Sequence, residues 1–127
     1  MNFLVTGASG FIGFHLCDFL LKRNHNVYGV DDLNDYYDVN LKKSRLKILK
    51  NYNKFIFVKK KIEDGNLINS FQRKKIDVVI NLAAQAGVRH SLENPYVYIQ
   101  SNVLGQVNMF ELARKLKVKK FIYASSS

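Results

Sequence analysis

The stretch Thr6-Gly7-Ala8-Ser9-Gly10-Phe11-Ile12-Gly13 decides the fold of this chain. It follows a short apolar segment, residues 2–5, and it precedes a helical pattern that continues to about Arg23. A buried strand, a glycine-rich turn and a helix in this order are typical of a turn that binds the phosphates of a dinucleotide. The glycines here are spaced Gly-x-x-Gly-x-x-Gly.

Each glycine of this stretch has its own physical role. Gly7 lets the backbone turn tightly out of the strand, Gly10 lets a pyrophosphate approach the main chain, and Gly13 lets the helix pack close to the strand. The helix N-terminus then offers free N–H groups and the positive end of its dipole to the phosphates. A glycine triplet alone also fits a plain loop. A second apolar segment, residues 27–30, strengthens the case because it ends in Asp31, near the spacing of about 20 residues expected for a ribose-binding carboxylate.

The composition is that of one globular domain. The chain has 127 residues, of which 47% are hydrophobic and 24% charged, enough for a core. The one cysteine, Cys17, cannot form an internal disulfide, and its place in a helical pattern predicts a buried thiol. No apolar run has the length of a membrane span, and the chain starts directly with a strand rather than a signal peptide. We therefore expect a cytoplasmic location.

The formal net charge of +10 raises the question of nucleic-acid binding. Many of the lysines are spread over three segments, residues 42–50, 59–61 and 115–120, mostly at the ends of predicted helices and strands. Solvated lysines are common at such places, and an anionic small ligand suits the charge equally well. The sequence thus predicts no nucleic-acid partner.

Alternating apolar and amphipathic segments predict an α/β fold of the Rossmann type. Its parallel sheet has the strand order 3-2-1-4-5, with helices on both faces, and the sequence stops after strand five. The expected strands are residues 2–5, 27–30, 55–58, 78–81 and 121–124. The first expected helix follows the glycine-rich turn and ends near Arg23, and the other three span residues 41–50, 67–73 and 94–115. The last of these has Asn94 as its cap and Pro95 in its first turn. The buried helix faces are expected to be Ile12, Leu16, Phe19 and Leu20, and Ile99, Val103, Val107 and Phe110.

Three polar or small-residue segments allow two interpretations each. Residues 82–87 have small side chains after a central strand, which leaves room for a ligand or permits close loop packing. The tyrosines of loop 33–38 either form a wall of a nucleotide site or cover the edge of the sheet. Asn102 is either a satisfied core amide or a ligand contact.

These motifs resemble the NAD-dependent sugar epimerase/dehydratase family, a branch of the extended short-chain dehydrogenases/reductases. The matching pieces are residues 6–13, Asp31 with Asn34, residues 81–84, Asn102 with Gly105, and the serines at 125–127. Residues 32–37 and 84–91 resemble more specifically the nucleotide-sugar 4-epimerases that act on UDP-glucuronate. The similarity spans the whole chain, so residues 1–127 are interpreted as the NAD-binding Rossmann domain, without the substrate domain.

The resemblance implies NAD as the cofactor and assigns site residues by position. The residues implied at the pyrophosphate are Gly7, Gly10, Phe11, Ile12 and Gly13. Those at the adenosine are Asp31, Asn34 and Ile62, and those toward the nicotinamide are Leu82, Ala83, Ala84 and Asn102. Ser126 matches the family's catalytic hydroxyl best, with Ser125 and Ser127 as alternatives. Arg89 is either a surface arginine or an anion contact for the substrate, and His90 has no paired ligand that would indicate a metal site.

Two departures from the family pattern affect the expected function. Lys61 stands where the family usually has an aspartate beside the adenine, and a lysine cannot accept the adenine amino proton. The family's catalytic Tyr-x-x-x-Lys pair is absent, because none of the seven tyrosines has a lysine four residues later. We therefore expect a chain that binds NAD but has no epimerase activity alone.

Three hypotheses of function follow. The chain is the front part of a UDP-glucuronate-type 4-epimerase, the front part of a dehydratase or decarboxylase relative, or a non-catalytic nucleotide-binding module. The sequence that follows Ser127 in the gene would separate them. NAD is expected over NADP, because Asp31 would repel a 2′-phosphate. The bare edge of strand five is expected to favour homo-oligomers.

Overall fold

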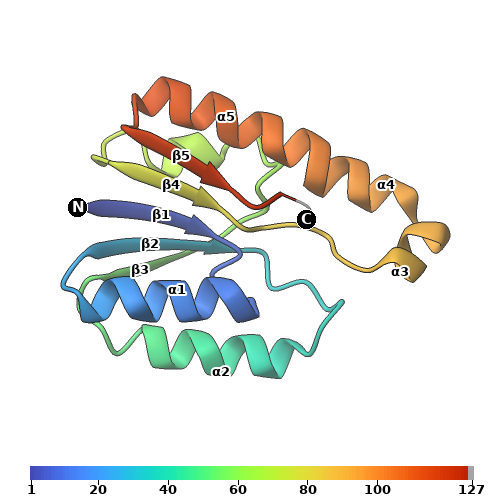
Figure 1. Ribbon diagram of the computed structural model, residues 1–127, viewed down its shortest axis with the longest axis horizontal. Helices are drawn as coiled ribbons and strands as arrows, with labels where there is room; N and C mark the ends of the chain where they lie inside the picture. Colours follow the sequence, from blue (N-terminus) through green and yellow to red (C-terminus); the bar gives the residue numbers. More distant parts are fainter. Residues whose placement is uncertain (126–127) are drawn as a thin grey trace.

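Five parallel strands form one sheet in the order β3-β2-β1-β4-β5 (Figure 1). The computed structural model describes residues 1–125. The central strand β1 pairs with β2 from Asn2 opposite Asn26 to Thr6 opposite Val30, and with β4 on its other side. The strand order expected from the sequence is confirmed. The strands are β1 Asn2–Thr6, β2 Asn26–Asp31, β3 Phe55–Lys59, β4 Val78–Asn81 and β5 Lys120–Tyr123.

Helices cover both faces of the sheet. In Figure 1, α1 and α2 lie against one face, and α5 lies on the other. The short helices α3 and α4 lie beyond the carboxyl ends of the strands. The helical segments are α1 Phe11–Lys22, α2 Val39–Leu49, the 3₁₀ turn η1 Leu67–Ser70, α3 Val88–Glu93, α4 Pro95–Tyr98, the π-helical turn η2 Ile99–Leu104 and α5 Gly105–Leu116.

The two faces of the sheet bury two separate cores. Alternate side chains of β1 point to opposite faces, so Val5 packs with Cys17 of α1 while Leu4 packs with Met109 of α5. The remaining core residues on the side of α1 and α2 include Leu20, Leu21, Val27, Leu46, Leu49 and Ile80. Those on the side of α5 and η1 include Val30, Ile62, Leu67, Phe71, Val79 and Leu112. Burial on both faces explains why the central strands β1 and β4 are continuously apolar rather than alternating.

The buried faces of α1 and α5 differ from those expected. Of the residues predicted to be buried, Ile12 and Phe19 of α1 are exposed by 67% and 49%. The stripe predicted for the last helix is also exposed, namely Ile99, Val103, Val107 and Phe110. Leu20 is buried and Leu16 is partly buried against the core, as predicted. The buried residues are Gly13, Cys17, Leu20 and Leu21 in α1, and Gly105, Met109, Leu112 and Ala113 in α5.

Both buried faces start at a glycine and continue with the same i, i+4, i+7, i+8 spacing. A Cβ at Gly105 would lie 2.6 Å from the Ile62 side chain, and one at Gly13 would collide with the backbone of Gly7. At these glycines, α1 approaches the turn after β1 and α5 approaches the segment after β3. The two helices also carry apolar residues on more than one face, so the helical period alone could not select the buried one.

Smaller differences concern the helix ends. Residues 67–73 form only the short turn η1, and α3 was not expected. Asn94 precedes α4 but makes no side-chain capping bond, whereas Pro95 does occupy the first turn. The predicted helix from residue 94 is divided into α4, the turn η2 and α5. No helix within residues 1–125 is long and apolar enough to cross a bilayer.

The thiol of Cys17 is fully buried in α1, as expected, and this burial raises its pKa to about 12. Because the thiolate is the reactive form, the native protein should react with Ellman's reagent at pH 8 at least about 100-fold more slowly than the protein unfolded in guanidinium chloride. His15→Cys in a Cys17→Ala background places the thiol on the exposed side of the same helix and should react fast. Equal rates for native and unfolded wild type would contradict the buried position.

Candidate functional site

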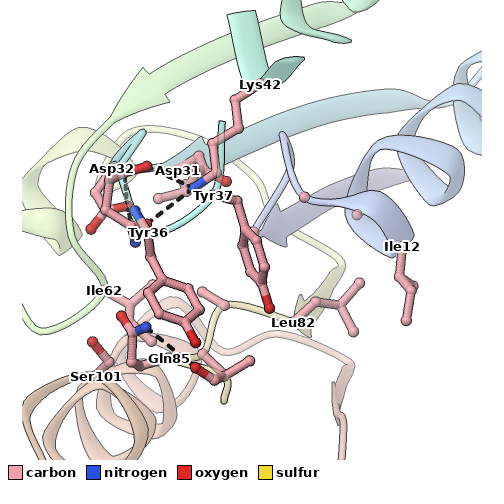
Figure 2. A pocket seen from close by; sticks show the side chains of 18 of the residues that line it. Ile12, Asp31, Asp32, Tyr36, Tyr37, Lys42, Ile62, Leu82, Gln85 and Ser101 are labelled. Atoms are coloured by element: carbon pink, nitrogen blue, oxygen red, sulfur yellow. Dashed lines mark hydrogen bonds between the residues drawn. The ribbon is translucent and has the colours of Figure 1, made fainter. Parts of the chain in front are cut away.

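A cavity of about 390 Å³ lies at the carboxyl ends of the strands (Figure 2). Its walls come from the glycine-rich turn with the start of α1, and from the segments that follow β2, β3 and β4. The predicted cofactor residues that line it are Gly7, Gly10, Phe11, Ile12, Gly13, Asp31, Asn34, Ile62, Leu82, Ala83 and Ala84. Tertiary structure thus brings four separate parts of the chain to one site. The binding roles of these residues remain predictions.

The glycine-rich turn has the geometry that its sequence predicts. Gly7 has φ of +69°, a left-handed conformation that favours glycine. Gly13 is required by packing, because a Cβ there would lie 1.9 Å from the carbonyl oxygen of Gly7. A Cβ on Gly10 would come no closer than 3.2 Å to any non-neighbouring atom within residues 1–125. That distance, to the carbonyl oxygen of Gly7, is already tight for a side chain, and Gly10 itself lines the cavity.

The first turn of α1 faces the cavity. The amide of Phe14 donates to the carbonyl oxygen of Gly10 at 2.9 Å, which starts the helical hydrogen-bond ladder. The N–H groups of Phe11, Ile12 and Gly13 precede that bond, where helix amides lack intrahelical acceptors. Gly10 supplies no side-chain cap for them. This turn can therefore bind an anion with its amides and its dipole.

Asp31 joins the glycine-rich turn to the loop after β2. Its side chain is buried; Oδ2 accepts from the amide of Ser9 at 3.1 Å, and Oδ1 accepts from the amide of Leu33 at 2.8 Å. Leu33 has φ of +55°, which is uncommon for a residue with a side chain. Each carboxylate oxygen has lone pairs for a second donor, so Asp31 can still accept from a ligand hydroxyl.

Asn34 organises polar groups on the same wall of the cavity. Its Nδ2 donates to Oδ1 of Asp32 at 3.1 Å, and its Oδ1 accepts from Nζ of Lys42 at 3.2 Å. Lys42 comes from α2 and also lines the cavity. Lys42 could not be recognised from the sequence, because a lysine in a basic helix has no local feature that distinguishes it from its neighbours.

The segment after β3 places Ile62, but not Lys61, in the cavity wall. Ile62 is buried and lines the cavity. Lys61 is exposed and does not line this cavity, whereas Lys60 and Glu63 do. Asp64 also stands outside the wall, and its carboxylate accepts from the amide of Asn66 at 2.8 Å.

A buried hydroxyl fixes the segment after β4. The hydroxyl of Thr6 donates to Oδ1 of Asn81. The hydroxyl oxygen of Thr6, Oγ1, also accepts from the amides of Leu82 and Ala83, each at 3.0 Å. Asn81 in turn donates to Oε1 of Gln106 at 2.6 Å. This network joins β1, β4 and α5 directly beneath the part of the cavity that Leu82 and Ala83 line.

Asn102 supports the next residues of that segment. Its Oδ1 accepts from the amide of Gln85 at 2.8 Å, and its Nδ2 donates to the carbonyl of Gln85 at 3.0 Å. Asn102 lines a second cavity of about 230 Å³, together with Asn81, Gln106 and Ser125. The residue is exposed, which contradicts its interpretation as a core amide and favours a role in holding the loop after β4.

The remaining predicted residues line neither of these two cavities, line only the second one, or lie outside the described residues. Ser126 and Ser127 lie beyond residues 1–125, while Ser125 lines the second cavity. Arg89 is exposed on α3 and lines neither cavity, so its role toward a substrate stays a prediction.

Loop 33–38 forms part of the cavity wall. Tyr36 and Tyr37 both line the cavity, and their rings meet edge to face at 4.8 Å (Figure 2). The Tyr36 ring also lies 4.9 Å from the ring of His90, and its hydroxyl occupies the space that a Cβ on Gly87 would need. The loops after β2 and β4 therefore meet at this end of the cavity.

Comparison with protein families identifies the chain. A family model described as GDP-mannose 4,6 dehydratase matches residues 4–127. The chain belongs to this family. The resemblance to NAD-dependent sugar epimerases and dehydratases that its motifs indicate is thereby confirmed.

Relatives of this family member include UDP-glucuronate 4-epimerases. The chain is 48% identical over 126 residues to UDP-glucuronate 4-epimerase of Thermodesulfobacterium geofontis. The match covers 98% of this chain and 39% of that protein. It is 50% identical over 128 residues to protein CapI of Staphylococcus aureus, covering 100% of this chain and 38% of the relative. The chain thus spans about two fifths of the length of these relatives.

Solved structures of similar proteins share the fold. UDP-glucuronic acid 4-epimerase of Bacillus cereus, solved with UDP-glucuronic acid and NAD, matches with a TM-score of 0.90 at 36% identity, covering 100% of this chain and 40% of that one. UDP-glucose 4-epimerase of Thermus thermophilus, solved with NAD, matches with a TM-score of 0.80 at 31% identity, covering 99% and 38%.

Substituting Gly13 should test how closely α1 must approach the glycine-rich turn. Gly13→Ala is expected to lower the free energy of unfolding by about 1–3 kcal/mol, because its Cβ would overlap the backbone of Gly7. Gly65→Ala is the matched control, since a Cβ there meets no atom within 4 Å in the described part of the chain, and its effect should stay within about 0.5 kcal/mol. Urea denaturation measures both. Equal stability of the two variants would contradict the packing argument.

Proposed function

We propose that this chain is the NAD-binding part of a nucleotide-sugar 4-epimerase of the UDP-glucuronate/UDP-galacturonate type. The observation that carries the proposal is the cavity itself. Its walls bring together the first turn of α1, which has no side-chain cap, the carboxylate of Asp31 and residues 82–84. Relatives at 44–48% identity that bear the name UDP-glucuronate 4-epimerase support the substrate class.

Four successive segments of the chain supply the proposed residues for the different parts of NAD. The amides of Phe11, Ile12 and Gly13 would bind the pyrophosphate, because these residues line the cavity at the N-terminus of α1. Asp31 would accept from the hydroxyls of the adenosine ribose, supported by Asn34. Ile62 would pack beside the adenine. Leu82, Ala83 and Ala84 would line the path to the nicotinamide, with Asn102 holding the loop that follows.

The proposed reaction is a reversible oxidation at the sugar C4. Bound NAD supplies the group that takes up and returns the hydride. The residues of this chain bind and orient the reactants, and Ser126, or its neighbour Ser125 or Ser127, would place the sugar oxygen. The base that removes the proton of the 4-hydroxyl is a tyrosine assisted by a lysine in the family resembled, and the 127-residue chain has no such pair.

A dehydratase or decarboxylase remains the second candidate. The description of the matching family as GDP-mannose 4,6 dehydratase supports it, because such enzymes share the same cofactor-binding half. A non-catalytic nucleotide-binding module is the third. Determining the gene sequence after Ser127 would separate the two enzyme candidates from the binding module: a Tyr-x-x-x-Lys pair would support an enzyme, and its absence the binding module.

The proposal extends to the surroundings of the protein. A nucleotide sugar is the proposed small-molecule partner, with Arg89 as a contact for its uronate carboxylate or diphosphate. The chain is proposed to act in the cytoplasm, without a nucleic-acid or membrane partner. β5 pairs with β4 and stands last in the strand order of the described sheet, and its free edge supports self-association.

The cofactor preference follows from Asp31. Calorimetric titration should show tighter binding of NAD than of NADP, because the buried carboxylate would repel a 2′-phosphate. Asp31→Ala should narrow the difference between the two dissociation constants. Asp35→Ala, which removes an exposed carboxylate of the same loop that does not line the cavity, should leave it unchanged. Equal or tighter binding of NADP by the wild type would contradict the prediction.

The purified chain should not interconvert UDP-glucuronate and UDP-galacturonate. Positioned acid–base catalysis contributes roughly 10²–10⁴-fold, and the chain lacks both the base and the half of its relatives that would orient the sugar. Incubation with NAD and UDP-glucuronate, followed by chromatography, measures the product. A longer chain that includes the gene's Tyr-x-x-x-Lys pair, if it encodes one, is the positive control. Clear formation of UDP-galacturonate by residues 1–127 would mean that another residue acts as the base.

A further inference from the structure

Lys42 is the one buried lysine within residues 1–125, with 7% of its surface exposed. It lies in the first half of α2, and its side chain extends from the helix toward the part of the cavity that Asp31 and Asp32 line (Figure 2). The neighbouring lysine on the same helix, Lys43, is exposed and does not line the cavity. The fold therefore selects one cation of a basic helix and places it at the site.

The ammonium group of Lys42 has only neutral partners in the described structure. Its Nζ donates to the carbonyl oxygen of Asn34 at 3.1 Å and to Oδ1 of Asn34 at 3.2 Å. None of the ion pairs within residues 1–125 includes Lys42. An ammonium carries three donors, so one N–H and the full positive charge remain for another oxygen. A buried charge is favourable only when such a partner is present.

The carboxylate of Asp31, on the same wall of the cavity, is already held by the backbone. Both oxygens of Asp31 accept backbone amides, from Ser9 and Leu33, which fixes the carboxylate in place. The wall thus presents a fixed acceptor, Asp31, and a fixed donor, Lys42. A sugar hydroxyl both donates and accepts, so such a pair suits a ribose diol, while a phosphate in the same place would be attracted by the ammonium and repelled by the carboxylate.

Other cations are less suited to this role. Arg45 of α2 donates from Nη1 to the carbonyl oxygen of Ser9 at 3.0 Å and does not line the cavity. Lys60 lines the cavity, but its Nζ donates to the carbonyl oxygen of Asn66 at 3.4 Å, on the segment after β3. Lys42 is the cation that the loop after β2 holds beside Asp31 and Asp32.

We propose that Lys42 is a specificity-determining residue of the nucleotide site. It donates to the ribose hydroxyls of the adenosine half, and its balance against Asp31 sets the preference between a free ribose 2′-hydroxyl and a 2′-phosphate. This inference rests on the proposed function, because it assumes that the cavity binds a dinucleotide. Lys42 is thus a second specificity-determining residue beside Asp31, and it lies on α2 rather than directly after β2.

The test compares NAD and NADP in four proteins by calorimetric titration: the wild type, Lys42→Met, Asp31→Ala and the double variant. In the wild type, Lys42→Met should weaken NADP binding by about 10-fold and NAD binding by less, so the preference for NAD should increase. Asp31→Ala should tighten NADP binding. The double variant should bind NADP about 10-fold more weakly than Asp31→Ala does.

Lys43→Met, alone and with Asp31→Ala, is the matched control, because it removes the same charge from the exposed side of α2. It should change the ratio of the two dissociation constants by less than about twofold, through screened long-range charge alone. A circular dichroism spectrum of each variant confirms folding.

Two failures are distinguishable. If the folded wild type binds neither nucleotide, the proposed function fails and the inference fails with it. If the wild type binds NAD but Lys42→Met weakens NAD and NADP equally in both backgrounds, Lys42 only holds the loop at Asn34. That result would overturn its role in specificity while leaving the proposed function intact.

Discussion

The close approach of α1 to the end of β1 is the constraint on which the site depends. Gly13 packs against the carbonyl of Gly7 at a distance that excludes any side chain. This contact seats Cys17, Leu20 and Leu21 in the core on that face of the sheet. It also brings the free amides of the first helical turn to the carboxyl edge of the sheet. Helix packing and anion binding therefore depend on the same missing side chain.

Buried polar side chains join the separate walls of the cavity into one rigid frame. Thr6 links β1 to β4 and holds the amides of Leu82 and Ala83. Asp31 links the glycine-rich turn to the loop after β2. Each such bond contributes only about 1 kcal/mol net, but a buried group left without its partner costs about 1–3 kcal/mol. The network therefore favours one arrangement of the backbone before any ligand arrives.

The helices show how far an apolar pattern alone can be trusted. The stripe that includes Val103 and Val107 has a helical period, yet it is exposed, and the face of α5 that starts at Gly105 is buried. Phe110 is intermediate between these two cases. The centroid of its ring lies 4.8 Å from that of Phe121 in β5, while 45% of the Phe110 surface stays exposed. A helical period shows that an apolar face exists, whereas the close approach at Gly13 and Gly105 selects which face is buried.

The sequence by itself determined the strand order, the glycine-rich turn and the acid after β2, and it predicted half of the residues that line the cavity. The turn and the acid follow from local backbone geometry and short spacings, and the strand order follows from right-handed crossovers between parallel strands. Only the tertiary structure decided which helix faces are buried and that Lys61 lies outside the cavity wall. It also decided that Lys42 rather than Lys43 reaches the site. These outcomes depend on how α2 and the segment after β3 dock against distant parts of the chain. Local sequence encodes backbone conformation, whereas a side chain's neighbours depend on packing between elements.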